Sequence, residues 1–250
     1  MVYNREQKTL AAFVKEEDDP SLANISLVGG TDISFVVGSD TQACASLVVL
    51  RADTLEVVYE DCEMVEMSLP YIPGFLAFRE ASHLERLVGK LRASRPDLVP
   101  QVLLVDGNGV LHPRRTALLL AFIKGTCVLK HCYSGCGVAC HLGIKCDIPT
   151  IGVGKKFFNV DGLDIALLRP RFETELLHGG DSLELKGESG RVWGRALRTA
   201  DGAPNPVFVS VGHRVSIATA TSIVARFATY RVPEPIRQAD IRSRARLRDL

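Results

Sequence analysis

Four residues stand where their side chains could do chemistry, although each also has a plainer structural interpretation. Asp32 lies inside the strand-like stretch "TDISFV", Asp106 ends the apolar run "VLLV", Glu80 ends "GFLAFRE", and His213 follows "VSVG". Separately, they read as a strand-start aspartate, a turn former, a solvated helix glutamate and a loop histidine. Together, carboxylates at strand ends with a nearby histidine suit a hard divalent cation such as Mg²⁺. Such a site can polarise a phosphate and activate water, so the set predicts phosphodiester hydrolysis.

A second group of residues suggests contacts with nucleic acid. Pro70 and Pro73 bracket and stiffen Tyr71, which is either a core tyrosine at a helix entry or a rigid aromatic wedge that enters stacked bases. Basic side chains gather at 112–115 ("HPRR") and 154–158 ("GKKFF"), either as solvated surface or as grips for phosphates. The segment 241–250 predicts a solvated basic tail with weak RNA contact, because its arginines alternate and define no helix face. These are Arg242, Arg244, Arg246 and Arg248.

The elements that must position these residues follow from hydrophobic periodicity. A helix is expected from Asn4 to about Lys15, and another opens at Pro73 and runs on to about Ser94. Between them, three stretches rich in β-branched residues predict an antiparallel meander. Later apolar stretches predict buried central strands that alternate with helices. The pattern therefore predicts an α/β fold, with a mixed sheet, an N-terminal antiparallel meander and helices on both faces, in a single domain spanning 1–250.

Composition excludes several classes of protein. The chain has 250 residues and a net charge of +1, so it carries no global attraction for nucleic acid or acidic membranes. Its longest clean apolar run, "TALLLAFI", is far shorter than the roughly 20 residues of a membrane span. The polar start does not read as a secretory signal. Seven cysteines, an odd number, favour free thiols in a reducing compartment.

Six motifs, in order along the chain, resemble the endonuclease V family of inosine-specific endonucleases. They are "GGTDISF", "PYIPGFLAFRE", "LLVDGNGVLHPR", "GVACHLG", "IGVGKK" and "SVGHR". The resemblance covers nearly the whole chain and implies an RNase H-like fold. It implies cleavage of a phosphodiester one nucleotide beyond inosine on the 3′ side, in single-stranded RNA and also in deaminated DNA. It further implies a monomer of the cytoplasm and nucleus, including the nucleolus, that binds no membrane.

The same resemblance implies roles for individual residues. Asp32, Glu80, Asp106 and His213 would hold Mg²⁺, for which Mn²⁺ can substitute, and would organise the attacking water. Lys155 would contact the scissile phosphate as a further catalytic residue. Tyr71 would be the tip of the wedge, and glycines would let the backbone approach the hypoxanthine base. The substrate-binding residues would be Tyr71, Pro73, Gly74, Leu76, Gly107, His112 and Arg114.

The chain departs from the family pattern between Arg114 and Gly135. The family runs almost directly from the "HPR" segment into "GVACHLG", whereas here 115–134 adds 134 − 115 + 1 = 20 residues. Three interpretations are open: a tolerated surface loop, an odd splice form or gene model, and a new metal site. The metal ligands would be Cys127, His131, Cys132, Cys136 and Cys140, whose spacing matches no zinc ribbon or finger. The rival to the enzyme is a catalytically impaired RNA-binding variant in which the insertion disrupts the base pocket.

Overall fold

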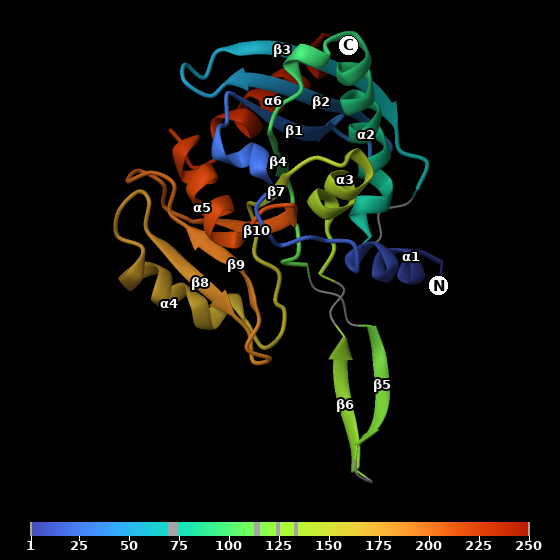
Figure 1. Cartoon of the computed structure of the whole chain (residues 1–250), viewed down its shortest axis with the longest axis vertical. Coiled ribbons are helices and arrows are strands. Elements are labelled where there is room, and N and C mark those ends of the chain that lie inside the picture. The colour runs from blue at the N-terminus through green and yellow to red at the C-terminus, as the bar shows by residue number, and fades with distance from the viewer. Residues whose placement is uncertain (1, 70–74, 113–115, 124–125, 133–134, 250) are drawn as a thin grey trace.

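A computed structural model describes residues 2–69, 75–112, 116–123, 126–132 and 135–249. Within these residues, eight strands form one mixed sheet in the order β3-β2-β1-β4-β7-β10-β9-β8 (Figure 1). The strands β1 (Leu27–Phe35), β2 (Gln42–Arg51) and β3 (Val57–Glu66) form the expected antiparallel meander. The predicted RNase H-like mixed sheet is therefore confirmed.

The centre of the sheet is parallel, and its far half is antiparallel. β4 (Val102–Asp106) runs parallel to β1, and β7 (Thr150–Gly154) runs parallel to β4. β10 (Val207–His213) turns back antiparallel to β7, followed by β9 (Val192–Leu197) and β8 (Ser182–Lys186). Because β10 runs the other way, its C-terminal end lies at the opposite end of the strands from the C-terminal ends of β4 and β7. The side of the sheet where β10 ends is called the opposite edge below.

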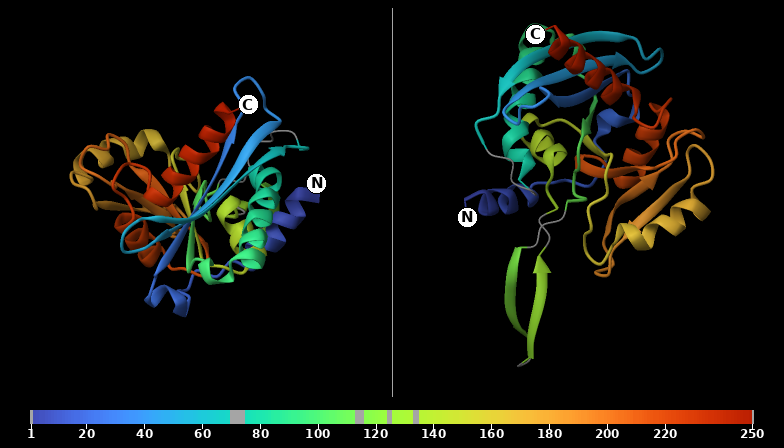
Figure 2. Two further views of the ribbon diagram at one scale, coloured as in Figure 1. Left: turned by 90° about the horizontal axis from the view of Figure 1, so that it is seen from above. Right: turned by 180° about the vertical axis from the view of Figure 1, so that it is seen from behind.

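Helices cover both faces of the sheet, as predicted (Figure 2). On one face, α2 (Leu76–Ser94) and α3 (Val138–Cys146) pack apolar side chains such as Leu87 and Leu142 against Leu103 and Val105. On the other face lie α5 (Ile217–Arg226), followed by its C-cap Phe227, and α6 (Glu234–Arg248). Phe227 and Ile236 of α6 pack against the alternate residues of the same strands. This alternation assigns each strand residue to one helical layer or the other.

Shorter elements complete the domain. α1 (Val2–Ala11) contacts α3, and α4 (Ile165–Glu175) covers β8 and β9. Single 3₁₀ turns span Pro20–Ala23 and Pro96–Leu98. No helix in the described ranges combines the length and apolar character needed to cross a membrane.

Two expectations about the termini were wrong. The first helix ends at Ala11, before Lys15. The segment 241–250 is not a solvated tail, since α6 continues as helix to Arg248 with Ser243 fully buried against the sheet. Docking of one face of α6 overrides the lack of periodicity among the arginines and places Arg244 and Arg248, four residues apart, on one side of the helix.

The insertion forms a hairpin outside the main sheet. β5 (Thr116–Ile123) and β6 (Thr126–Cys132) pair antiparallel as a separate sheet that stands off the body of the domain (Figures 1 and 2). At its base, Gly137 N donates to Gly109 O over 2.9 Å, so the two flanks of the insertion meet directly. The hairpin thus leaves the loop after β4 docked on the start of α3.

Candidate active site

Asp32 and Asp106 lie side by side on adjacent parallel strands. The β1–β4 register pairs Thr31 with Val105, so the next residues along each strand are the two aspartates. Alternation along the strands turns both carboxylates toward the face that α6 covers. Asp32 is 5% exposed and lies in the interior of β1, which rules out an edge or strand-start role for it. Placing two like charges opposite one another in a sheet is destabilising, which indicates a function.

Two further carboxylates face this pair from the helices. Glu80, in the second turn of α2, is buried, and the charges of Asp106 and Asp32 act on it. The charge of Asp240, on α6, acts on Asp32, and Asp240 lines a pocket together with Asp32 and Asp106. Sequence analysis missed Asp240, because it reached α6 only as a helix running into a tail. The available signal was an acidic residue in the otherwise basic stretch "RQADIRSRAR".

Two carboxyl groups of the cluster, those of Asp32 and Glu80, have raised pKa values. Burial, then a hydrogen bond with Asp106 and the Asp106 charge, raises the pKa of Asp32 to about 7. Burial, then the charges of Asp106 and Asp32, raises the pKa of Glu80 to about 8, although the nearby Arg79 guanidinium opposes the shift. Buried carboxyl groups with too few cationic neighbours are typical of a site that binds a cation.

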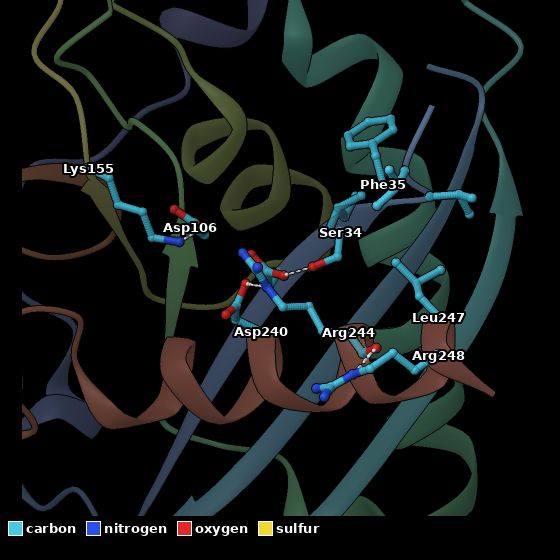
Figure 3. Close-up of a pocket in the computed structure, with 12 residues that line it drawn as sticks. Ser34, Phe35, Asp106, Lys155, Asp240, Arg244, Leu247 and Arg248 are labelled. Atoms are coloured by element: carbon cyan, nitrogen blue, oxygen red, sulfur yellow. Dashed lines mark hydrogen bonds and ion pairs between the residues drawn. The ribbon is translucent and has the colours of Figure 1, made fainter. Parts of the chain in front are cut away.

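The cations of the pocket are Lys155 and arginines of α6. Lys155 Nζ donates to Asp106 Oδ2 over 2.6 Å. Burial opposes the charge of Lys155, but the Asp106 charge and hydrogen bond outweigh it and hold the pKa of the lysine above its ordinary value. Arg244 Nε pairs with Asp240 Oδ1 at 2.8 Å. Figure 3 shows Lys155 and Asp106 at the strand ends, facing Asp240 and Arg244 on α6. These four residues, with Arg248, line a pocket of about 750 Å³.

His213, predicted as a fourth metal ligand, lies apart from this cluster. It pairs with Thr150, which pairs with Leu103, three residues before Asp106. That offset of three residues places His213 about 10 Å from the level of Asp106, measured along the strands. Its Nδ1 accepts from Lys15 N at 3.4 Å, and burial and the charge of Arg214 lower its pKa. It lies apart because β10 is antiparallel to β7, so its end lies at the opposite edge of the sheet.

The predicted substrate residues divide into two groups. Tyr71, Pro73, Gly74 and Arg114 lie outside the described residues. Leu76 begins α2, Gly107 follows β4, and His112 is buried beyond the glycine turn. Gly107 has φ +141°, and a Cβ there would meet Val138 Cγ1 at 2.5 Å, so this turn accepts only glycine. The turn is therefore fixed by packing on α3.

The donor set fits a hard divalent cation. Across the described segments, no three histidine, cysteine, aspartate or glutamate side chains are gathered into a ready-made metal cage. Mg²⁺ does not need one, since it is usually held by one or two carboxylates together with waters and substrate phosphates. Asp32 and Asp106 form such a pair, with Glu80 and Asp240 beside it. Oxygen ligands with uncompensated charge suit Mg²⁺ or Mn²⁺ better than zinc.

Two of the five residues considered from sequence as a new metal site have described side chains, and both lie in the core. Cys136 and Cys140 are fully buried in the core, and Cys140 Sγ donates to Val211 O at 3.7 Å. The side chains of Cys127, His131 and Cys132 lie outside the described residues. Among the cysteines whose side chains the structure describes, Cys44, Cys62, Cys140 and Cys146 are free thiols.

A mixed sheet that gathers carboxylates at the ends of adjacent strands, with a lysine and arginines around them, defines a class of phosphodiester-cleaving enzymes. Comparison with known proteins narrows the class. The Endonuclease V family model matches residues 8–123 and 120–241, two segments that meet at the hairpin. The chain is 47% identical to mouse endonuclease V over 253 residues, which cover 99% of this chain and 69% of the relative.

Solved structures agree with this assignment. The crystal structure of human ENDOV superimposes with a TM-score of 0.87 at 44% identity, covering 99% of this chain and 98% of the other. Ciona intestinalis endonuclease V, in complex with DNA containing an inosine followed by a ribo-adenosine, gives a TM-score of 0.87 at 32% identity, covering 99% and 96%. The chain belongs to the endonuclease V family and is a nuclease of that family.

Proposed function

We propose that this chain is a divalent-metal-dependent endoribonuclease that cuts single-stranded RNA one nucleotide beyond inosine on the 3′ side. Mg²⁺ is the favoured ion, Mn²⁺ can replace it, and inosine in DNA is a further substrate. The observation that carries the proposal is the pair of buried Asp32 in β1 and half-buried Asp106 at the end of β4, side by side on adjacent strands with Lys155 on Asp106. The Ciona relative, bound to DNA with an inosine followed by a ribonucleotide, supports both the base and the sugar preference.

The carboxylates and the cations around them have different roles in the proposed cleavage. Asp32, Asp106, Glu80 and Asp240 would hold the cation, which supplies phosphate polarisation and an activated water when it is bound. Lys155 keeps a full positive charge beside Asp106 and is placed to meet a non-bridging phosphate oxygen. Arg244 and Arg248, on one side of α6, offer guanidinium groups to neighbouring phosphates. The glycine turn after Asp106 lets the backbone approach a base closely.

A second candidate function is an RNA-binding protein whose hairpin has disabled cleavage. The carboxylates, Lys155 and the Gly109–Gly137 contact at the base of the hairpin all persist, which favours the enzyme. The proposal extends to a monomer and to a reducing compartment, the cytoplasm or nucleus; the free thiols of Cys44, Cys62, Cys140 and Cys146 support the compartment.

The test is cleavage of a single-stranded RNA carrying one inosine, beside an adenosine control, with Mg²⁺ and with EDTA. The full chain, a chain lacking 115–134 and the variant Asp106→Asn are compared. We expect the first two to cut only the inosine RNA and only with metal. Cleavage by the shortened chain alone would establish the disabled binder, and equal cutting of both RNAs would refute inosine specificity. Failure of both folded proteins to cut would refute the proposed function.

A further inference from the structure

Two serine hydroxyls hold one oxygen of the Asp32 carboxylate. Ser34 Oγ lies 3.0 Å from Asp32 Oδ2, and Ser243 Oγ lies 3.1 Å from the same atom. The two hydroxyls are also 2.8 Å from each other, so the three side chains form a closed triangle. Neither serine bonds to Oδ1, the other oxygen of the carboxylate. Figure 3 shows Ser34 among the residues that line the pocket.

The serines reach Asp32 from different parts of the chain. Ser34 is two residues further along β1, so alternation puts it on the same face as Asp32. Ser243 is three residues after Asp240 on α6, so both lie on the side of the helix that meets the sheet. Ser243 is 0% exposed, and its bond to Asp32 joins residues 211 positions apart. The hydrogen bond from Ser243 therefore links α6, which also carries Asp240, to β1.

The donors and acceptors around the two serines determine which atoms their hydroxyl protons bond. Each serine has one O–H to donate. The acceptors within reach are Asp32 Oδ2, the other serine oxygen and Asp240 O, which lies 3.0 Å from Ser243 Oγ. An ionised carboxylate is a stronger acceptor than a neutral hydroxyl or carbonyl. Both protons consequently go to Oδ2 once Asp32 is ionised.

We propose that Ser34 and Ser243 are positioning residues that orient Asp32 for the cation, by holding Oδ2 and leaving Oδ1 free of serine contacts. The inference rests on the proposed function, because it needs Asp32 to be a metal ligand. Polar partners that orient a ligating carboxylate set the affinity of a metal site. The two hydroxyls do this from opposite sides of the interface between β1 and α6.

A purely structural role makes a different prediction. A buried serine in a helix–sheet interface needs a hydrogen-bond partner, and Asp32 supplies one whatever the site binds. Removing the hydroxyl would then lower stability without a specific effect on metal. Thr150 is a matched control: it is also 0% exposed, and its Oγ1 donates to Ala139 O at 2.8 Å at the other edge of the sheet.

The experiment measures Mn²⁺ binding directly by electron paramagnetic resonance, with urea unfolding of the same metal-free proteins. Ser34→Ala and Ser243→Ala are compared with wild type, with the hydroxyl-preserving Ser34→Thr and with Thr150→Val. We expect about tenfold weaker Mn²⁺ binding in each alanine variant, the scale for lost partners of a metal ligand. Ser34→Thr should bind within about threefold of wild type, since it keeps the donor. Thr150→Val should lose stability and keep its metal affinity.

Wild-type affinity in a folded alanine variant would overturn the inference, as would an equal loss of metal affinity in Thr150→Val. If Ser243→Ala does not fold, the partly exposed Ser34 still provides the test. The proposed function fails separately, when wild type itself binds no Mn²⁺ or does not cut inosine RNA. Wild-type metal binding and cleavage, together with unaffected serine variants, would refute only the positioning role.

Discussion

The two ends of the central strands treat their acidic residues in opposite ways. Near the C-terminal end of β4, burial and the charge of Asp106 raise the pKa of Asp32 to about 7 and that of Glu80 to about 8. At the other edge, beside the end of β10, hydrogen bonds from Ser21, assisted by the Arg214 charge, lower the pKa of Asp19. Burial opposes the charge of Asp18, but bonds from Ser216 and Thr219 outweigh it and lower the pKa of that carboxyl as well.

This difference separates a site for chemistry from a site for stability. Asp19 is fully provided with donors within the fold, so its charge contributes to holding the loop before β1 onto Arg214. Asp32 and Glu80 lack enough cationic partners within the fold, and they keep protons until something else supplies positive charge. Uncompensated burial of charge is costly, and it indicates a ligand rather than a structural ion pair.

The strongest test of this contrast is Asp106→Asn. The variant keeps the shape of the side chain but removes the charge that Lys155 and the cation share. We expect RNA cleavage to fall by at least about 10²-fold, the scale for losing a charge-stabilising group in an active site. Circular dichroism should show an unchanged fold. Cleavage within a few fold of wild type would mean that the acidic cluster is not the active site.

The pH dependence of metal-free stability tests the raised pKa values. Asp32 and Glu80 titrate near 7 and 8 when folded, above their ordinary values of 3.8 and 4.5. From about pH 5 to 8 the folded state therefore binds more protons than the unfolded state, and stability must fall as pH rises. In EDTA, wild type should lose stability across this range, and Glu80→Gln should lose less because the amide side chain cannot ionise. Urea unfolding at both limits measures the difference, and identical slopes would contradict it.

Asp19→Asn examines the opposite edge. The amide removes the charge that pairs with Arg214, and it weakens the hydrogen bond that Asp19 accepts from Ser21 N. We expect the free energy of unfolding to fall by about 1 kcal/mol, the scale of a charged hydrogen bond at a partly exposed position. Cleavage per folded molecule should not change. A loss of cleavage comparable with that of Asp106→Asn would remove the proposed division between the two edges.

The smallest effect is expected for His213→Asn. His213 belongs to the stabilising edge, where its Nδ1 accepts from Lys15 N. Cleavage and its dependence on Mg²⁺ concentration should stay within about twofold of wild type, because no lost contact reaches the acidic cluster. Steady-state cleavage with varied Mg²⁺ is the measurement. A large drop in metal affinity would restore the histidine to the metal site.

Sequence reasoning predicted the fold well because its helices and strands can be recognised from local patterns. The meander, the apolar strand before Asp106 and the helices around it follow from periodicity and turn chemistry. The same reasoning placed Asp32, Glu80 and Asp106 in one site, and the structure brings them together. It also placed His213 in that site, from which the structure sets it apart, and missed Asp240, since strand direction and the docking of α6 depend on contacts between distant segments.

The sequence by itself determined that this chain is an α/β nuclease of the endonuclease V family with a carboxylate site and a foreign insertion. Only the tertiary structure decided which carboxylates meet. Alternation and register put Asp32 beside Asp106, and α6 brings Asp240 and Ser243 to the pair. The structure also showed that the insertion leaves the core as a hairpin whose flanks meet through Gly109 and Gly137. Residue types carry the chemistry, but long-range packing sets the distances at which charges interact.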